Sequence, residues 1–343
     1  MHRHLAAFAF FLFASAPVAW AAEPPRIVAS IPPVHSLVAA VAEGVSEPAL
    51  LLRGGASPHA YSMAPSDARA LQDADLVVWV GPSLETFLLR ALRGNRAGRE
   101  ILTLVDLPTI KLLPARSGEA FETDPHDHSH AHDHGDDHGD DHGDARKGHD
   151  HADDESDDHD DHARSDGAQD HIDAHLWLDP ANARAIVAAV ADTLVRLDPE
   201  RATAYRSNAA RALAGLDELD GALGQILAPV RDRPFVVFHD AYQYLEDRYG
   251  LAVVGAITVA PDRKPGARRL RAIHDRIATT GATCVFAEPQ FRPDVIATVI
   301  EGTTARAGVA DPLGAELSPG PDLYGRLMTA LASSLAACLT PTL

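Results

Sequence analysis

Two series of short apolar runs, each run followed by a helical stretch, constrain the fold of this chain more than any other feature. The first series lies in residues 26–104 and the second in residues 235–338. Apolar runs that alternate with helices predict βαβ units around a mostly parallel sheet. Single hydrophobic cores stop growing at roughly 250–300 residues, so a chain of 343 residues is expected to form two lobes.

The elements of each lobe follow from the runs themselves. In the first series we expect strands at 26–31, 49–52, 76–80 and 101–104, and helices at 34–43, 67–71 and 84–92. In the second we expect strands at 235–238, 252–257, 283–287 and near Val309, and helices at 240–249, 267–279, 294–305 and 323–338. The hydrophobic content of 46% is ordinary, which excludes wholesale disorder.

A long helix is predicted between the two series. It begins at Asp198-Pro199-Glu200 and keeps an apolar stripe to about Ala228. A helix of this length spans roughly 45 Å, which is longer than one lobe. The predicted fold class is therefore α/β, with two Rossmann-like lobes joined by one long rigid helix and a metal site in the cleft between them.

Residues 122–173 differ sharply in composition from the rest of the chain. They hold 20 Asp or Glu, only three basic residues and 12 of the 19 histidines, so they account for nearly all of the net charge of −19. Such a tract cannot bury a core. It is either a solvated linker or a collector of zinc, whose weak imidazole and carboxylate sites and negative field attract cations. With three lysines and no basic patch, the chain is a poor partner for nucleic acid.

The N-terminus predicts export. Residues 1–21 combine a basic Arg3, an apolar run at 5–14 and an Ala19-Trp20-Ala21 cleavage site, which is typical of a signal peptide. Ten apolar residues cannot span a bilayer of ~30 Å, and no later run reaches 18. We expect a soluble periplasmic monomer that is not embedded in the membrane.

In that oxidising compartment the two cysteines, Cys284 and Cys338, are expected to form a disulfide.

Four polar residues follow predicted strands or precede a helix, where ligands bind in open α/β sheets. His239 comes directly after the 235–238 run, His59 follows the 49–52 run, His175 precedes Trp177, and Asp311 closes a short apolar segment. A single histidine at a strand end is usually structural. Three outside the tract favour a metal site, since three imidazoles with a carboxylate or water form the tetrahedral set that suits Zn²⁺.

These residues lie in segments that resemble a known family, the periplasmic zinc-binding proteins of bacterial high-affinity zinc uptake ABC transporters, within the cluster A-I metal-binding superfamily. The resemblance covers nearly the whole chain after residue 21. Besides the tract, it is carried by IVASIPPVHSLV, GASPHAYSMAPSDA, HLWLDPANA, VFHDAYQYLEDRYGL, FAEPQF and DPLG.

The resemblance implies a function and a ligand set. It implies zinc ligation by His59, His175 and His239, with Asp311 or a water as the fourth ligand. Manganese-binding relatives have Glu where this chain has His239, which favours zinc.

The resemblance also implies that the tract is a mobile loop over the cleft, that the long helix limits lobe movement, and that the cysteine pair is a family disulfide. The expected partners are a membrane permease and, indirectly, its cytoplasmic ATPase; the expected segments are 1–21, 22–121, 122–173, 174–198, 199–228 and 229–343.

Other residues and other functions also fit parts of the sequence. His35 begins a helix and is not expected to bind metal, His274 is expected on a solvated face, and Glu288 is favoured as an acceptor behind a ligand over a ligand itself. A secreted zinc hydrolase is an alternative, although the chain has neither HExxH nor G-x-S-x-G. A periplasmic zinc buffer that acts through the tract is another. The chain lacks G-K-[ST], so it is not the ATPase, and we expect a binding protein and no enzyme.

Overall fold

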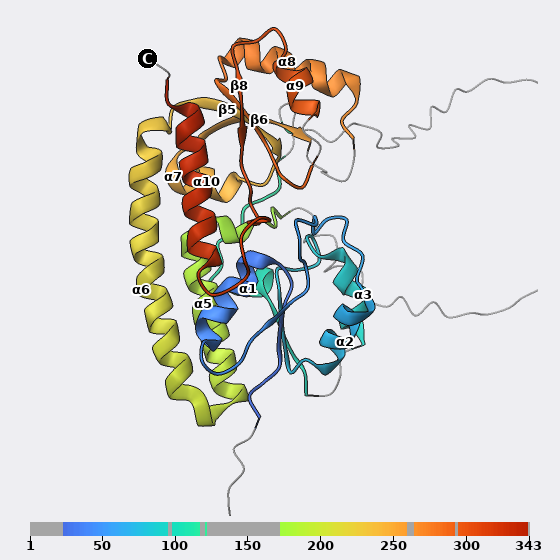
Figure 1. Cartoon of the computed structure of the whole chain (residues 1–343), viewed down its shortest axis with the longest axis vertical. Helices are drawn as coiled ribbons and strands as arrows, with labels where there is room; N and C mark the ends of the chain where they lie inside the picture. Colours follow the sequence, from blue (N-terminus) through green and yellow to red (C-terminus); the bar gives the residue numbers. More distant parts are fainter. Residues whose placement is uncertain are drawn as a thin grey trace, which may run out of the picture.

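The computed structural model describes residues 23–94, 98–116, 121, 172–258, 264–291 and 294–341. The predicted signal peptide and all of the His/Asp tract except its last two residues lie outside these ranges. Within them the chain forms two lobes, each built on a four-stranded sheet (Figure 1). Every strand pair in both sheets is parallel.

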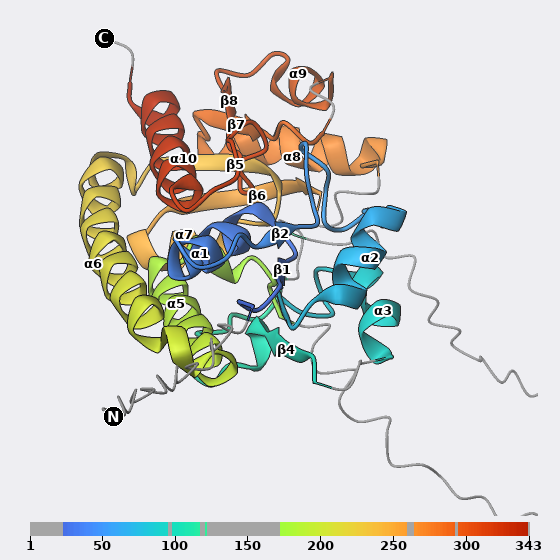
Figure 2. The same cartoon turned by 60° about the horizontal axis from the view of Figure 1, so that its bottom comes forward.

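The first lobe contains the sheet β2-β1-β3-β4. Its strands are β1 (Ile27–Ala29), β2 (Ala49–Leu50), β3 (Leu76–Trp79) and β4 (Glu100–Thr103). Helices α2 (Pro65–Asp73) and α3 (Leu89–Arg93) cover one face, and α1 (Pro32–Ala42) and α5 (Pro180–Leu197) lie on the other side (Figure 2). The apolar run of β3 is fully buried because both faces of the sheet are covered.

The second lobe contains the sheet β6-β5-β7-β8. Its strands are β5 (Pro234–His239), β6 (Ala252–Thr258), β7 (Cys284–Ala287) and β8 (Arg306–Val309). Its helices are α7 (Gln243–Tyr249), α8 (Ala267–Thr280), α9 (Asp294–Ile300) and α10 (Leu323–Leu339). Side chains of α8 and α9 pack on one face, whereas those of α10 pack on the other. The predicted disulfide between Cys284 and Cys338 is present and joins β7 to α10.

The long helix is α6 (Ala202–Leu227), with 26 residues and a length of about 39 Å. Short 3₁₀ turns at Pro199–Arg201 and Ala228–Val230 flank it, so these elements together run over residues 199–230, two residues past the predicted end at 228. It packs on α1 and α5 of the first lobe and on α10 of the second (Figure 1). The predicted fold class, two parallel α/β lobes joined by one long helix, is confirmed.

The two lobes share a continuous apolar core on the side of α6. The largest buried cluster includes side chains of β1, β3, α1 and α5 together with those of β5 and α10. Hydrogen bonds also join the lobes: the Trp177 indole donates to the Pro312 carbonyl at 2.8 Å, and the Tyr324 hydroxyl donates to the Trp177 carbonyl at 2.8 Å.

In the part of the chain that the structure describes, no helix is both long enough and apolar enough to span a bilayer.

Candidate metal centre

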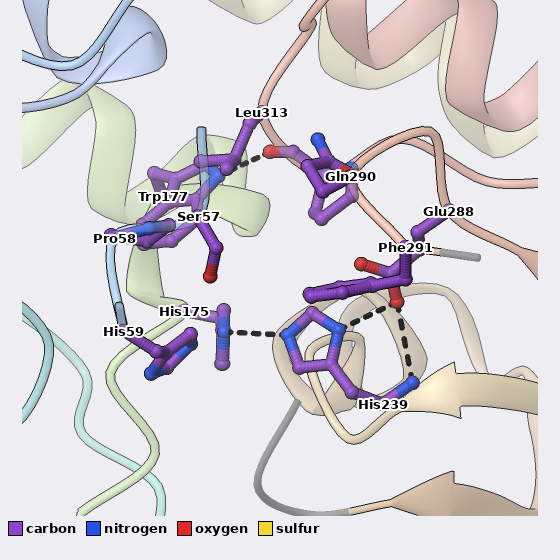
Figure 3. A pocket seen from close by; sticks show the side chains of 11 residues that line it. Ser57, Pro58, His59, His175, Trp177, His239, Glu288, Gln290, Phe291 and Leu313 are labelled. Carbon is purple, nitrogen blue, oxygen red and sulfur yellow. Dashed lines mark hydrogen bonds and ion pairs between the residues drawn. The ribbon is translucent and has the colours of Figure 1, made fainter. Parts of the chain in front are cut away.

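Three histidines meet in one pocket between the lobes (Figure 3). His59 lies in the loop between β2 and α2, His175 directly precedes the 3₁₀ turn Leu176–Leu178 that leads to α5, and His239 is the last residue of β5. The first two belong to the first lobe and the third to the second lobe. His175 and His239 are buried, with 7% and 4% of their surface exposed, whereas His59 is half-buried.

The spacing of the imidazoles suits a single small cation. One ring nitrogen from each histidine lies within 4.8 Å of those of the other two. The Nε2 atoms of His175 and His239 are 3.2 Å apart. The centroid of the His59 ring lies 5.6 Å from the centroid of the His175 ring and 5.8 Å from that of the His239 ring. Two nitrogens bound tetrahedrally to Zn²⁺ at 2.0–2.1 Å would be separated by about 3.3 Å.

A carboxylate holds the far side of two of these rings. Asp173 Oδ1 lies 2.7 Å from His175 Nδ1 and also accepts from the His175 backbone N–H at 2.9 Å. Glu288 Oε1 lies 2.6 Å from His239 Nδ1 (Figure 3). Because a carboxylate accepts, each Nδ1 carries the hydrogen and each Nε2 presents a lone pair to the pocket. Two lone pairs facing each other at 3.2 Å repel unless a cation, either a proton or a metal ion, lies between them.

Charge and burial affect the histidines differently. Burial lowers the pKa of His59 well below 6.5, and the neighbouring His175 and His239 lower it further. Burial also opposes protonation of His239, but the charge and hydrogen bond of Glu288, helped by Asp240 and Asp173, outweigh it and raise the pKa of His239. The pocket therefore attracts positive charge to the side of His239 and keeps His59 neutral and ready to coordinate.

The space beside the three rings is small. It measures about 10 Å³, close to the minimum that holds one water molecule. Beyond the histidines and Glu288 it is lined by Ser57, Pro58, Trp177, Gln290, Phe291, Pro312 and Leu313. A single ion fits this space, whereas an organic substrate does not.

The remaining candidates lie elsewhere. Asp311 is not part of the three-histidine group: its carboxylate accepts from Gln290 Nε2 and from three successive amides of its own loop, residues 313–315. Short-range bonds of this kind are typical of Asp in turns. His35 is buried against the Pro48 carbonyl, and His274 is half-buried on α8, with its Nε2 3.1 Å from the Glu301 carbonyl oxygen. Glu288 contacts His239 and does not itself belong to the group.

Asp173 is the site residue that the sequence analysis missed. It was counted with the acidic tract, as the last residue of that segment. A signal was present, since an acid two residues before a ligand histidine can reach that ring's Nδ1 when the backbone turns, as it does here.

The sequence matches a protein-family model described as "Zinc-uptake complex component A periplasmic", named ZnuA, over residues 27–338. The chain belongs to the ZnuA family. It is 47% identical over 320 residues to the high-affinity zinc uptake system protein ZnuA of Brucella suis, with 93% of each chain covered. It is 46% identical to the protein of the same name from Paracoccus denitrificans over 319 residues, again with 93% of each covered.

Solved structures show the same fold as this ZnuA-family chain. A crystal structure of ZnuA matches with a TM-score of 0.68 at 23% identity, covering 93% of this chain and 100% of the other. The periplasmic zinc-binding protein TroA from Treponema pallidum matches with a TM-score of 0.70 at 20% identity and the same coverage. The family predicted from the sequence motifs is thus confirmed, and so is the two-lobed architecture.

Proposed function

We propose that this chain is the periplasmic zinc-binding component of a zinc ABC importer. It captures one Zn²⁺ between its lobes and delivers it to a membrane permease, whose cytoplasmic partner hydrolyses ATP. Membership of the ZnuA family and close similarity to zinc uptake proteins over almost the whole chain support this function. The chain acts as a solute-binding protein and not as an enzyme.

The observation that carries the proposal is the His175–His239 pair. Both Nδ1 atoms bond to buried carboxylates, so both Nε2 atoms offer lone pairs to the space between them. The two Nε2 atoms are 3.2 Å apart. Asp173 and Glu288 are only 6% and 3% exposed, and buried carboxylates need positive charge nearby. A dication bound by three neutral imidazoles would balance both of them, which favours a divalent metal over a monovalent one.

His59, His175 and His239 supply three ligands to Zn²⁺ in this proposal. Imidazole nitrogen is a preferred zinc ligand, and three such ligands are a familiar zinc set. The Asp311 carboxylate accepts from loop amides, and Glu288 Oε1 accepts from His239; neither acid belongs to the group of three histidines. We assign the fourth position to a water molecule, and the two acids behind His175 and His239 to orienting the rings.

The geometry favours a carrier over the two alternatives. A zinc hydrolase needs room for a substrate at the open position of the metal, whereas the space here is about 10 Å³ and is lined by Trp177 and Phe291 beside the histidines. A buffer acting through the His/Asp tract needs no histidine outside that tract, yet His59, His175 and His239 all lie outside it. In keeping with export, residues 1–21 are proposed to be a cleaved signal peptide.

Calorimetric titration with Zn²⁺ tests the proposal. The protein and a variant lacking residues 124–170 are titrated at pH 7.5, with His274→Ala as a control because that histidine lies on α8, outside the site. We expect one tight site in all three proteins and loss of the weak sites on deletion alone. Loss of the tight site on deletion would contradict a carrier with its site between the lobes.

A further inference from the structure

A second set of contacts joins the lobes near the histidines, where residues 110–116 of the first lobe contact helix α7 of the second. The Lys111 ammonium pairs with Asp247, and the Leu113 amide donates to the Tyr244 hydroxyl at 3.0 Å. Both partners lie on α7, which follows the strand that ends at His239. These contacts are separate from those of Trp177 and Tyr324, which reach the loop before α10 and α10 itself.

The segment that carries His175 is fastened to this crossing. Pro114 and Ile172 form an antiparallel bridge, and the Asp173 amide donates to the Leu113 carbonyl at 2.9 Å. The Tyr244 hydroxyl, which accepts from Leu113, donates in turn to the Asp173 carbonyl at 2.8 Å. The backbone leading to His175 is therefore fixed both to residues 113–114 and to α7.

Arg116 fastens the same crossing to the strand end that carries His239. Its Nε and Nη2 donate to the two oxygens of Asp240, the residue after His239, with Nε 2.9 Å from Oδ2. Its Nη1 and Nη2 donate to Glu246 on α7 at 2.7 and 2.8 Å. The three side chains are 18%, 9% and 11% exposed, and the Phe121 ring covers the guanidinium at 3.9 Å. Two bidentate pairs shielded from water hold a geometry more firmly than exposed ion pairs do.

The contacts connect two of the histidines by a continuous path. It runs from His239 to Asp240, across the ion pair to Arg116, back along the chain to Pro114, across the bridge to Ile172, and on to His175. We propose that Arg116 is a positioning residue for zinc: it holds the end of β5 against the segment of His175, so that the two Nε2 atoms keep the spacing that zinc requires. This inference rests on the proposed function of the three histidines.

Two effects of Arg116 on zinc have opposite signs. As a cation near the site, Arg116 repels Zn²⁺, so removing its charge would tighten binding. As a link between the segments, it raises the fraction of chains whose histidines are gathered, and apparent affinity falls in proportion when that fraction falls. The direction of the change therefore separates positioning from simple charge.

The test removes the link and keeps the charge. Arg116→Gln with Glu246→Gln takes away one positive and one negative group, so the formal charge of the cluster is unchanged, while Asp240 loses the guanidinium that holds it. Burial raises the pKa of Glu246 to about 7, so measurements are made at pH 8, where the carboxylate is charged. Arg116→Lys is the conservative variant, because an ammonium cannot form both bidentate pairs.

Arg248→Gln with Asp220→Asn is the matched control. Arg248 also lies on α7 and is 24% exposed, and its Nε donates to Asp220 of α6 at 2.8 Å. Like the test pair, this change removes one positive and one negative group that join α7 to another element, but neither residue adjoins a histidine of the metal centre. Any effect of general loosening of α7 should appear in both double variants.

Each whole protein is loaded with one equivalent of Zn²⁺ and mixed with a fluorescent zinc chelator, and thermal unfolding is recorded in parallel. We expect Arg116→Gln/Glu246→Gln to release zinc about tenfold faster, Arg116→Lys to lie between it and wild type, and the control to stay within twofold of wild type. Release at the wild-type rate, tighter binding, or equal acceleration in the control would each overturn the role of Arg116. If the His239→Ala variant bound zinc as tightly as wild type, the proposed function itself would be overturned.

Discussion

At the residue scale, the two carboxylates behind the imidazoles decide what the site can bind. Asp173 and Glu288 fix the hydrogen of His175 and His239 on Nδ1, so that Nε2 is left to coordinate. They also place two negative charges beside the cation. Each therefore contributes through orientation and through charge, although neither is expected to touch the metal.

Replacing either acid with its amide should weaken zinc binding. Asp173→Asn and Glu288→Gln keep an acceptor of the same shape but remove the charge, and changes of this kind typically cost 10–100-fold in affinity, or about 1.4–2.7 kcal/mol. The measurement is a competition titration with a chelator of known affinity. Asp192→Asn, an exposed acid on α5, is the control and should bind as wild type. Wild-type affinity in both amide variants would show that the carboxylates do not support the ligands.

The dependence of zinc binding on pH should reflect His239. Burial opposes protonation of this ring, but the charge and hydrogen bond of Glu288 outweigh it and raise the pKa of His239, so zinc competes with a proton for the ring. Below the raised pKa, affinity should fall about tenfold per pH unit; above it, affinity should be flat. The lowered pKa of His59 keeps that ring neutral in the same window. Calorimetry in buffers of different ionisation enthalpy should detect protons released on zinc binding below the raised pKa of His239, and no release there would contradict this assignment.

The sequence predicted the site unevenly, for physical reasons. His59, His175 and His239 can be proposed from the sequence because histidines beside apolar runs in an α/β pattern are easily recognised, and the structure brings the three together. The role of Asp173 depends on a backbone turn, and that of Arg116 depends on a chain crossing 124 residues away from Asp240 in sequence. For the fourth ligand the resemblance implies Asp311 or a water, and in the structure the Asp311 carboxylate accepts from amides of its own loop. The final position of such side chains also depends on tertiary packing, which the local sequence does not determine alone.

At the scale of elements, the sequence predicted types well and ends less well. The run at 49–52 forms a strand only at Ala49–Leu50, although Leu51 and Leu52 still donate to backbone carbonyls of the neighbouring β1 edge. The helix expected at 240–249 begins only at Gln243, because the Ala241 amide turns back to the His239 carbonyl. That turn is what separates the metal ligand from α7 and leaves Asp240 free to face Arg116.

Helix α6 should tolerate stiffening. Gly215 and Gly221 are exposed within it, and a Cβ at either position would meet nothing within 4 Å. Glycine inside a helix is less stable than alanine by roughly 0.5–1 kcal/mol, so Gly215→Ala/Gly221→Ala should stabilise the protein by about 1–2 kcal/mol. The free energy of unfolding should rise in urea, with zinc affinity unchanged because both positions lie outside the pocket.

The matched control for that change is Gly250→Ala. Gly250 ends α7 with a φ of 68°, where a side chain is strained, so the same substitution should destabilise by about 1–2 kcal/mol. If all three alanines had the same effect, the gain in α6 would not come from helix propensity.

At the scale of the whole molecule, the site depends on both lobes. Two of the proposed ligands come from the first lobe and one from the second, while α6 and a shared apolar core hold the lobes together on one side. Because the shared core and the disulfide are built from residues other than the three histidines, we expect the fold to form without zinc. Zinc should therefore add stability to a structure that already exists, in proportion to its affinity.

Thermal unfolding of wild type and of His239→Ala, with and without one equivalent of Zn²⁺, tests this account most directly. Both proteins lack residues 124–170, so that the tract does not compete for metal. At a hundredfold excess over its Kd, a ligand stabilises the native state by about 2.7 kcal/mol. We predict similar Tm values without zinc, a clear rise in Tm with zinc for wild type, and a much smaller rise for His239→Ala. An equal rise in both proteins would show that His239 is not a ligand and would contradict a zinc site that joins the two lobes.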